Sequence, residues 1–198
     1  MLERISTFDA EIAPVQVKDC VYRFYRNTRF SPDKSPYKRH FGAYINAKGK
    51  KALRGGYYIH LEPGHCLVAT GNYWLPTNIL TSCRNEMMAN TAEWLRCVES
   101  PELLEYYGTD DDPSAQSNEW TESWDMPRGF GLTKLKTCPS GFPKDWPHVK
   151  YLRLKDYCCW HAVGDTFSRV TDGLMPWSAC SGTAPHLSVL CSVSHSAS

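Results

Sequence analysis

The chain has 198 residues, 42% of them hydrophobic, which suits a single globular domain with its own core. Its net charge of +1 conceals an uneven distribution: half of the 22 lysines and arginines lie between residues 18 and 54, and about half of the 21 acidic residues lie between 86 and 125. No stretch approaches the roughly 20 apolar residues of a membrane helix, and the first residues lack a signal-peptide core. We therefore expect a cytoplasmic protein with no membrane partner, and we predict no particular oligomeric state.

Residues 17–70 are predicted to be mainly β-structure. Residues 17–26 are rich in β-branched and aromatic types and predict a strand, whereas 31–38 contain two prolines and predict a loop. Residues 41–46 predict a second strand. Around the Pro63-Gly64 turn, residues 55–62 and 65–70 predict an antiparallel hairpin. Because side chains alternate along a strand, Tyr58, His60 and Glu62 are expected to share one face.

The helices are predicted to follow this hairpin. Apolar residues recur at helical spacing between 77 and 107, and residues 146–154 suit a further helix. Residues 108–128 are acidic and turn-rich and predict a surface loop, and 156–163 predict a last strand. The expected fold is therefore α+β: a twisted antiparallel sheet with the helices of 77–107 packed on one face. The other face is then expected to carry the functional cleft.

The expected domain organisation is an N-terminal remnant over residues 1–16, a single α+β domain over 17–172, and a tail over 173–198. The tail contains no Asp, Glu, Lys or Arg and shows neither helical nor strand periodicity. We predict that it is irregular and disordered.

Nine cysteines raise the question of disulfides or a metal, but their number is odd and no pair has CxxC spacing. We expect free thiols, no bound metal and no cofactor. A metal site built from Glu62 and several histidines lacks HxH or HxxxH spacing. The histidines in question are His60, His65, His148 and His161. A nucleophile–base pair among Cys158, Cys159 and His161 rests only on their proximity in sequence.

The basic and aromatic residues of the first 60 positions are the main candidates for ligand binding. Guanidinium and ammonium groups suit phosphate or carboxylate, and tyrosine rings can stack on a ligand. The candidate ligand-binding residues are Arg23, Arg26, Arg29, Lys34, Tyr37 and Tyr58, with Lys38 as a further cation. The alternatives left open are internal pairing with carboxylates, a phosphorylated small molecule, and a nucleic acid.

His60 and Glu62 are the candidate catalytic residues, because both groups can act as general acids or bases near neutral pH. An ordinary hydrogen-bonded sheet face explains the same pattern. The sequence contains no GxxxxGK[ST], GxGxxG or GxSxG, which argues against P-loop, dinucleotide-binding and serine-hydrolase activities. The sequence therefore identifies no reaction, and whether the protein is an enzyme stays open.

Residues 23–38, RFYRNTRFSPDKSPYK, resemble the signature R-x-x-R-D-x-R-F, then D/N-K-x-x-Y, of a bacterial family known as domain of unknown function 2461. Two later blocks are also similar to this family: GYYIHLEPG at 56–64 and LKTCPSGFPKDWPHVKYLRLKDY at 135–157. The resemblance covers residues 17–163. It implies a conserved hypothetical protein and brings no established reaction, cofactor or ligand.

Three departures from the family pattern stand out. Asn27 replaces the usual aspartate of the signature, the chain begins just before the signature, and the tail lacks the amphipathic helix expected at the end. The resemblance therefore implies a shortened member, with a tail that is read out of frame. Our sequence-based hypothesis is a soluble module that binds an anionic, phosphate-bearing ligand through the basic, aromatic-rich motif. The alternatives are an enzyme with a His/Glu/Arg cleft and a nucleic-acid-associated protein.

Overall fold

The computed structural model describes residues 1–7, 9–30, 32–50, 55–73, 75–108, 128–131 and 133–163. Its centre is a five-stranded antiparallel sheet in the order β1-β2-β3-β5-β4. The strands are β1 Phe41–Ile45, β2 Gly56–Leu61, β3 Leu67–Asn72, β4 Arg128–Phe130 and β5 Tyr157–Ala162. The helices are α1 Leu2–Ser6, the 3-10 turn η1 Ala10–Ile12, α2 Val17–Cys20, α3 Thr77–Ala89, α4 Thr91–Val98, α5 Pro101–Tyr107 and α6 Val149–Leu152. The expected α+β fold is confirmed.

The sheet is built from a local meander and one distant strand. β1, β2 and β3 pair with their sequence neighbours, and β5 returns to pair with β3 and with β4. The register places Tyr44 opposite Tyr58, Tyr58 opposite Ala69, and Ala69 opposite Trp160. These side chains form one row across four strands on the same face, which we call the cavity face. The neighbouring rows on this face, one on each side, pass through Gly56 and His60 of β2.

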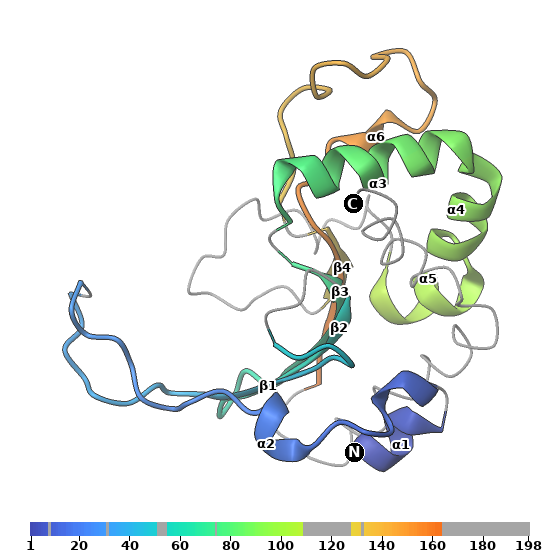
Figure 1. The fold of residues 1–198 in the computed structure, drawn as a ribbon. Coiled ribbons are helices and arrows are strands. Elements are labelled where there is room, and N and C mark those ends of the chain that lie inside the picture. The colour runs from blue at the N-terminus through green and yellow to red at the C-terminus, as the bar shows by residue number, and fades with distance from the viewer. Residues whose placement is uncertain are drawn as a thin grey trace.

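Helices α3, α4 and α5 cover the other face at the β3–β5–β4 end of the sheet. In Figure 1 the sheet is seen nearly edge-on, with these helices on one side of it. Their buried residues include Cys83, Met87 and Trp94, and they join Tyr157 and Cys159 of β5 in the larger hydrophobic cluster. Because Tyr157 and Cys159 alternate with Cys158 and Trp160, β5 gives one set of side chains to the helices and the other to the cavity face.

A second, smaller cluster lies on the helical face at the β1–β2 end. Ile5 of α1 and Ile12 of η1 are almost completely buried there, together with Ile45 and Ile59 of the sheet. Tyr57 packs against both clusters, and its hydroxyl donates a hydrogen bond to Asp9 Oδ2 over 2.8 Å. The two clusters therefore meet at one side chain of β2.

The strand predicted over residues 17–26 was wrong. Residues 17–20 form the single turn of α2, closed by the Val21 amide donating to the Val17 carbonyl over 3.2 Å. Beyond it the chain leaves the sheet, and β pairing is limited to the isolated bridges Val21–Ala43 and Tyr25–Tyr37. The composition of the segment favours extended backbone, but only single residues find a partner strand.

The remaining predicted elements agree with the structure or lie outside it. The strand at 41–46, the hairpin, the helices of 77–107 and the last strand are confirmed as β1, β2–β3, α3–α5 and β5. The helix predicted at 146–154 is shorter, since α6 begins only after Pro147. The loop at 108–128 falls almost wholly, and the tail at 173–198 wholly, outside the described residues. No helix of the described part of the chain is long and apolar enough to cross a membrane.

Candidate functional site

A cavity of about 470 Å³ opens on the cavity face. Its floor is the sheet itself, with Tyr58 of β2, Ala69 of β3 and Trp160 of β5 lying in one cross-strand row. Its volume falls within the range of small-molecule sites, which is about 300–1,000 Å³. The lining residues are Tyr22, Lys38, His40, Tyr44, Lys50, Gly56, Tyr58, Leu67, Ala69, Thr70, Gly71, Tyr73, Cys158 and Trp160.

The hollow exists because one row of the sheet has almost no side chains. Gly56 of β2 pairs with Gly71 of β3, which pairs with Cys158 of β5. A Cβ at Gly71 would lie 2.1 Å from the Tyr157 carbonyl oxygen, and the residue has a φ of +104°. Glycine is therefore required at this point of the sheet, and the missing side chains leave the space that the neighbouring aromatic rings enclose.

Two lysines give the cavity a positive wall. Lys38 Nζ and Lys50 Nζ lie 5.8 and 5.6 Å from the centre of the Tyr22 ring, and Lys50 also donates to the Val21 carbonyl over 2.7 Å. Both side chains are half-buried. Within the described residues neither ammonium forms an ion pair with a carboxylate. Their charges are therefore available to an anion in the cavity.

Three tyrosines of the cavity, Tyr22, Tyr58 and Tyr73, keep their protons over the physiological range. Burial raises the pKa of Tyr58 to about 12, and the neighbouring Tyr22 and Glu62 act in the same direction. Burial also raises the pKa of Tyr22 and of Tyr73. These phenols can therefore donate hydrogen bonds to a ligand while their rings provide flat contact area.

Tyr58, His60 and Glu62 share one face of β2 as expected, and they form a continuous hydrogen-bonded chain. The Tyr58 hydroxyl lies 3.0 Å from His60 Nδ1, and His60 Nε2 lies 3.2 Å from Glu62 Oε2. The His40 ring stacks on the His60 ring with 4.3 Å between centroids. Burial lowers the pKa of both histidines, although Glu62 opposes this shift, so both imidazoles are neutral near pH 7.

Among the three residues of the suggested nucleophile–base pair, strand alternation separates Cys158 from His161 and leaves Cys159 on the helical face with His161. Cys158 lines the cavity and donates its thiol proton to Asp156 Oδ1 over 3.1 Å. His161 lies on the helical face, where its Nδ1 contacts the Tyr106 carbonyl at 2.8 Å and its ring stacks on Tyr106. A base–nucleophile contact between these two side chains is therefore not formed.

The signature segment forms an arm, which we define as residues 22–40 without Ser31. Figure 1 shows it projecting from β1 on the side of the sheet opposite α3–α5. Its outgoing and returning segments are held together by the Arg26 amide donating to Pro36 O over 2.9 Å and the Lys38 amide donating to Phe24 O over 2.7 Å. Phe24 stacks on Tyr25 and Tyr37, with centroids 4.5 and 5.3 Å apart.

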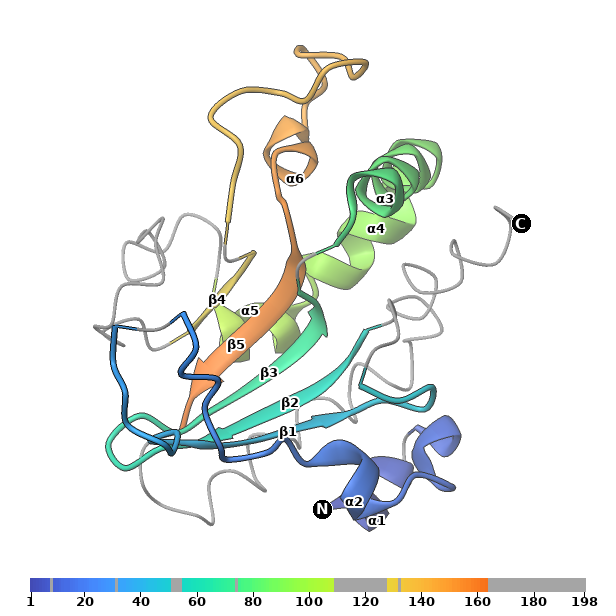
Figure 2. The ribbon, with the colours of Figure 1, turned by 60° about the vertical axis from the view of Figure 1, so that its left-hand side comes forward.

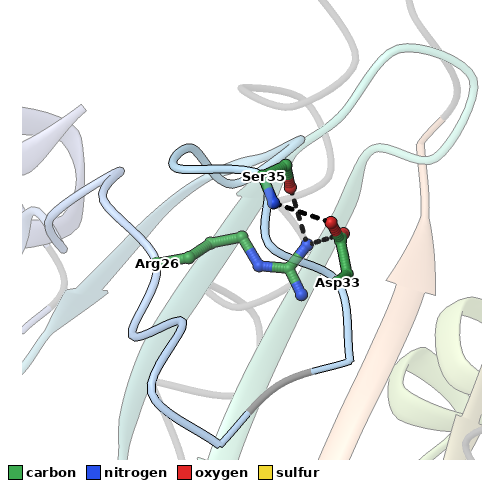
Figure 3. A network of polar contacts seen from close by, with 3 residues as sticks. All are labelled: Arg26, Asp33 and Ser35. Atoms are coloured by element: carbon green, nitrogen blue, oxygen red, sulfur yellow. Dashed lines mark hydrogen bonds and ion pairs between the residues drawn. The ribbon is translucent and has the colours of Figure 1, made fainter.

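The tip of the arm is tied together by Arg26, Asp33 and Ser35 (Figure 3). Arg26 Nη1 donates to Asp33 Oδ2 and, over 3.2 Å, to the Ser35 hydroxyl. The Ser35 amide donates to Asp33 Oδ1 over 2.9 Å, and this hydrogen bond is the largest reason that the pKa of Asp33 lies below its ordinary value. One of the predicted anion-binding arginines is thus engaged with a carboxylate of its own loop.

The sequence-predicted ligand residues divide between the arm and the cavity. Tyr58 lines the cavity, whereas Arg23, Arg26, Arg29, Lys34 and Tyr37 lie on the arm and are not among the lining residues. Lys34 Nζ donates to the Thr28 carbonyl over 3.0 Å, and the Arg29 guanidinium lies 5.3 Å from the centre of the Phe30 ring. The structure brings the two catalytic candidates, His60 and Glu62, into contact, with Tyr58 beside them.

Several cavity residues were missed by sequence reasoning. Lys50 lies in the basic window and could have been chosen by charge, but nothing in the sequence separates it from the nearby Lys48. Trp160 and Cys158 lie on the predicted last strand, two positions apart, so a shared face could have been predicted for them. Their place beside Tyr58 depends on the β3–β5 pairing, which no local pattern encodes.

The family model described as "Conserved hypothetical protein (DUF2461)" matches residues 1–175. This match includes the arm, all five strands and the helices α1–α6. No curated protein and no solved structure matches the chain.

Proposed function

The chain belongs to the conserved hypothetical protein family DUF2461, and we propose that it binds a small organic phosphate with a planar ring in the cavity. The observation that carries this proposal is the combination of Lys38 and Lys50 at one wall with aromatic rings around the rest of the cavity. Lysine is a compact positive charge that suits phosphate, and stacked rings favour flat ligands.

The composition of the walls supports a ligand with two different ends. Tyr44, Tyr58 and Trp160 lie in one row across the sheet, with Ala69 between Tyr58 and Trp160, and offer a wide aromatic surface. Lys38 and Lys50 both lie close to Tyr22, so the positive charge is gathered at one wall. A ligand that places its ring over the sheet and its phosphate beside Tyr22 satisfies both regions.

A ligand screen by thermal unfolding tests the proposal. We expect mononucleotides and other aromatic phosphates to raise the Tm at moderate salt, and a ligand at about 100 times its Kd stabilises the folded state by about 2.7 kcal/mol. The same screen contains sugar phosphates, aromatic carboxylates and inorganic phosphate. Comparison of their Tm shifts separates the contribution of the ligand's ring from that of its phosphate charge.

Charge-removing variants locate the site. Lys38→Gln/Lys50→Gln should lose the ligand-induced rise in Tm. Lys38→Gln alone should weaken this rise, and it is the single variant of choice because Lys50 also donates to the Val21 carbonyl. Lys136→Gln/Lys144→Gln removes the same charge from exposed positions outside the cavity and should keep the full shift. The proposal fails if no such ligand moves the Tm or if the two double variants respond alike.

The arm supports nucleic-acid binding as a second candidate function. The rings of Phe24, Tyr25 and Tyr37 stack on one another and are 42–58% exposed, and Arg23 and Arg29 lie close to them in the chain. Exposed rings with nearby cations suit single-stranded nucleic acid. Oligonucleotides in the same screen test it: binding that falls steeply with salt and is lost in Arg23→Gln/Arg29→Gln supports the arm, and binding that requires Lys38 and Lys50 supports the cavity.

A further inference from the structure

Two histidines and a glutamate meet at the end of the β1–β2 pair. The register pairs Phe41 of β1 with Leu61 of β2, so the residues just beyond them, His40 and Glu62, face each other across the same end of the ladder. His60 precedes Leu61, and strand alternation puts its side chain on the cavity face with Glu62. The sheet therefore brings three metal-binding side chains together from two segments of the chain.

We propose that His40, His60 and Glu62 bind one divalent transition-metal ion of the zinc class. A ring nitrogen of each histidine and a carboxylate oxygen of Glu62 all lie within 4.8 Å of one another. Two imidazoles and one carboxylate form a donor set that suits Zn²⁺, Fe²⁺ or Co²⁺, whereas Mg²⁺ and Ca²⁺ prefer oxygen donors alone.

His60 is already held as a metal ligand would be. It is only 3% exposed, its Nε2 points at Glu62, and its Nδ1 lies 3.0 Å from the Tyr58 hydroxyl. In metal sites the nitrogen that does not bind the ion usually donates its proton to a neighbouring group, which fixes the tautomer and the ring orientation. With Nδ1–H donating to the Tyr58 oxygen, Nε2 is left to bind the ion beside Glu62.

His40 completes the set from the opposite segment. Its ring lies 4.3 Å from the His60 ring and nearly parallel to it, at 28°. Within the described residues neither of its ring nitrogens is engaged in a hydrogen bond. Donors around a tetrahedral zinc ion lie roughly 3.3 Å apart, so the group must close slightly. His40 and Glu62 are both partly exposed, which leaves their side chains room for that movement.

The ion would lie at the wall of the cavity, since His40 and the supporting Tyr58 both line it. Three protein ligands leave a coordination position for water or for an anionic group of a ligand. The metal site goes beyond the organic-phosphate proposal, because all three of its ligands are protein side chains and no organic molecule is needed to form it.

Titration of the purified full chain with Co²⁺, without any organic ligand, tests the inference. We expect one tight site per chain, with visible d–d absorption typical of nitrogen and oxygen donors. Because the chain has nine cysteines, the near-ultraviolet thiolate-to-cobalt band is the essential control, and it should not grow during the first equivalent. Zn²⁺ should displace the Co²⁺ signal.

Variants assign the ligands. His40→Ala and Glu62→Gln should each raise the Kd by at least about 100-fold, and Tyr58→Phe, which removes the acceptor for Nδ1–H, by about 10-fold. His148→Ala removes a histidine outside the cluster and should leave the Kd unchanged. Far-UV circular dichroism checks that each variant is folded, and the two ligand variants give independent tests if one of them is not.

Three results would overturn the metal site: no stoichiometric binding, a thiolate band in the first equivalent, or an unchanged Kd in both folded ligand variants. Lys38→Gln/Lys50→Gln separates this proposal from the organic-phosphate one. It should lose the organic phosphate and keep the metal, so either proposal can fail while the other stands.

Discussion

At the scale of single residues, the arm shows how short-range hydrogen bonds decide the state of a charged group. Asp33 is exposed to solvent, yet it accepts the amide hydrogen of Ser35 and is paired with Arg26 (Figure 3). A carboxylate that receives such bonds prefers to stay ionised. Asp33 therefore has a local partner inside the arm.

We predict that the Asp33 carboxyl titrates below its ordinary pKa, and that the main cause is Ser35 rather than Arg26. Because the pKa is lower in the folded arm, the contact is fully formed above the unfolded pKa and is lost as the pH falls through the folded pKa. A carboxyl ¹³C NMR titration should show the pKa of Asp33 staying below its ordinary value in Arg26→Gln and in Ser35→Ala, because neither substitution removes the Ser35 amide hydrogen that contributes most. A return to the ordinary pKa in Arg26→Gln would contradict this explanation.

The sequence alone did not distinguish the arginine that is buried in the fold from the arginines that lie on the arm. Arg84 was not singled out from the sequence, yet it is 4% exposed and its guanidinium donates to the carbonyls of Leu152 and Leu154 over 2.8 and 3.0 Å. It ties α3 to the segment after α6. The arginines chosen from the signature lie on the arm instead, because a basic side chain gives no local indication of whether it will be buried.

At the scale of elements, the cavity depends on glycine in β3. Gly71→Ala should lower the free energy of unfolding by at least about 3 kcal/mol, because the new methyl group meets the Tyr157 carbonyl at 2.1 Å and the φ of +104° is strained for alanine. Gly64→Ala in the preceding turn has a φ of +80° but open space, and should cost about 1 kcal/mol. Urea denaturation of both variants measures the difference, and equal losses would show that the close approach is unimportant.

The elements that could be predicted are those whose signals are local. The β2–β3 hairpin follows from Pro63-Gly64 between two alternating runs, and α5 follows from Ser100-Pro101, where the Ser100 side chain accepts from the Leu103 amide. The strand over 17–26 was wrong because strand composition cannot provide a neighbour to pair with. The cavity could not be predicted, since its floor requires β3 and β5 to be adjacent.

At the scale of the whole molecule, two hydrophobic clusters lie on one face of the sheet and share Tyr57. We predict that they unfold together. Ile5→Ala in the smaller cluster and Leu152→Ala in the larger one should each cost about 3 kcal/mol, because both side chains are 0% exposed. Each variant should shift one common transition, seen alike by far-UV circular dichroism and tryptophan fluorescence.

A conservative variant provides the control for this prediction. Ile5→Val removes one methylene and should cost about 1 kcal/mol, with the same single transition. If Ile5→Ala instead produces two separated transitions, or shifts only one of the two signals, the clusters unfold independently and Tyr57 does not link them.

Part of the charge asymmetry of the sequence can be followed in the described residues. The basic arm projects on one side of the sheet, and helices α3–α5, which carry Glu86, Glu93, Glu102 and Glu105, lie on the other (Figures 1 and 2). Arg26 pairs with Asp33 of the arm itself, which agrees with the internal pairing with carboxylates that the sequence left open.

The strand order has a consequence for synthesis on the ribosome. β1, β2 and β3 can pair as soon as they leave the exit tunnel, but the partner of β3 is β5, which is made only after α3–α5 and the segments that follow. Until then one edge of β3, a strand that includes Leu67 and Val68, has no strand to pair with, and exposed edges invite association between nascent chains. Slow translation between β3 and β5 should therefore lower the soluble yield of this protein.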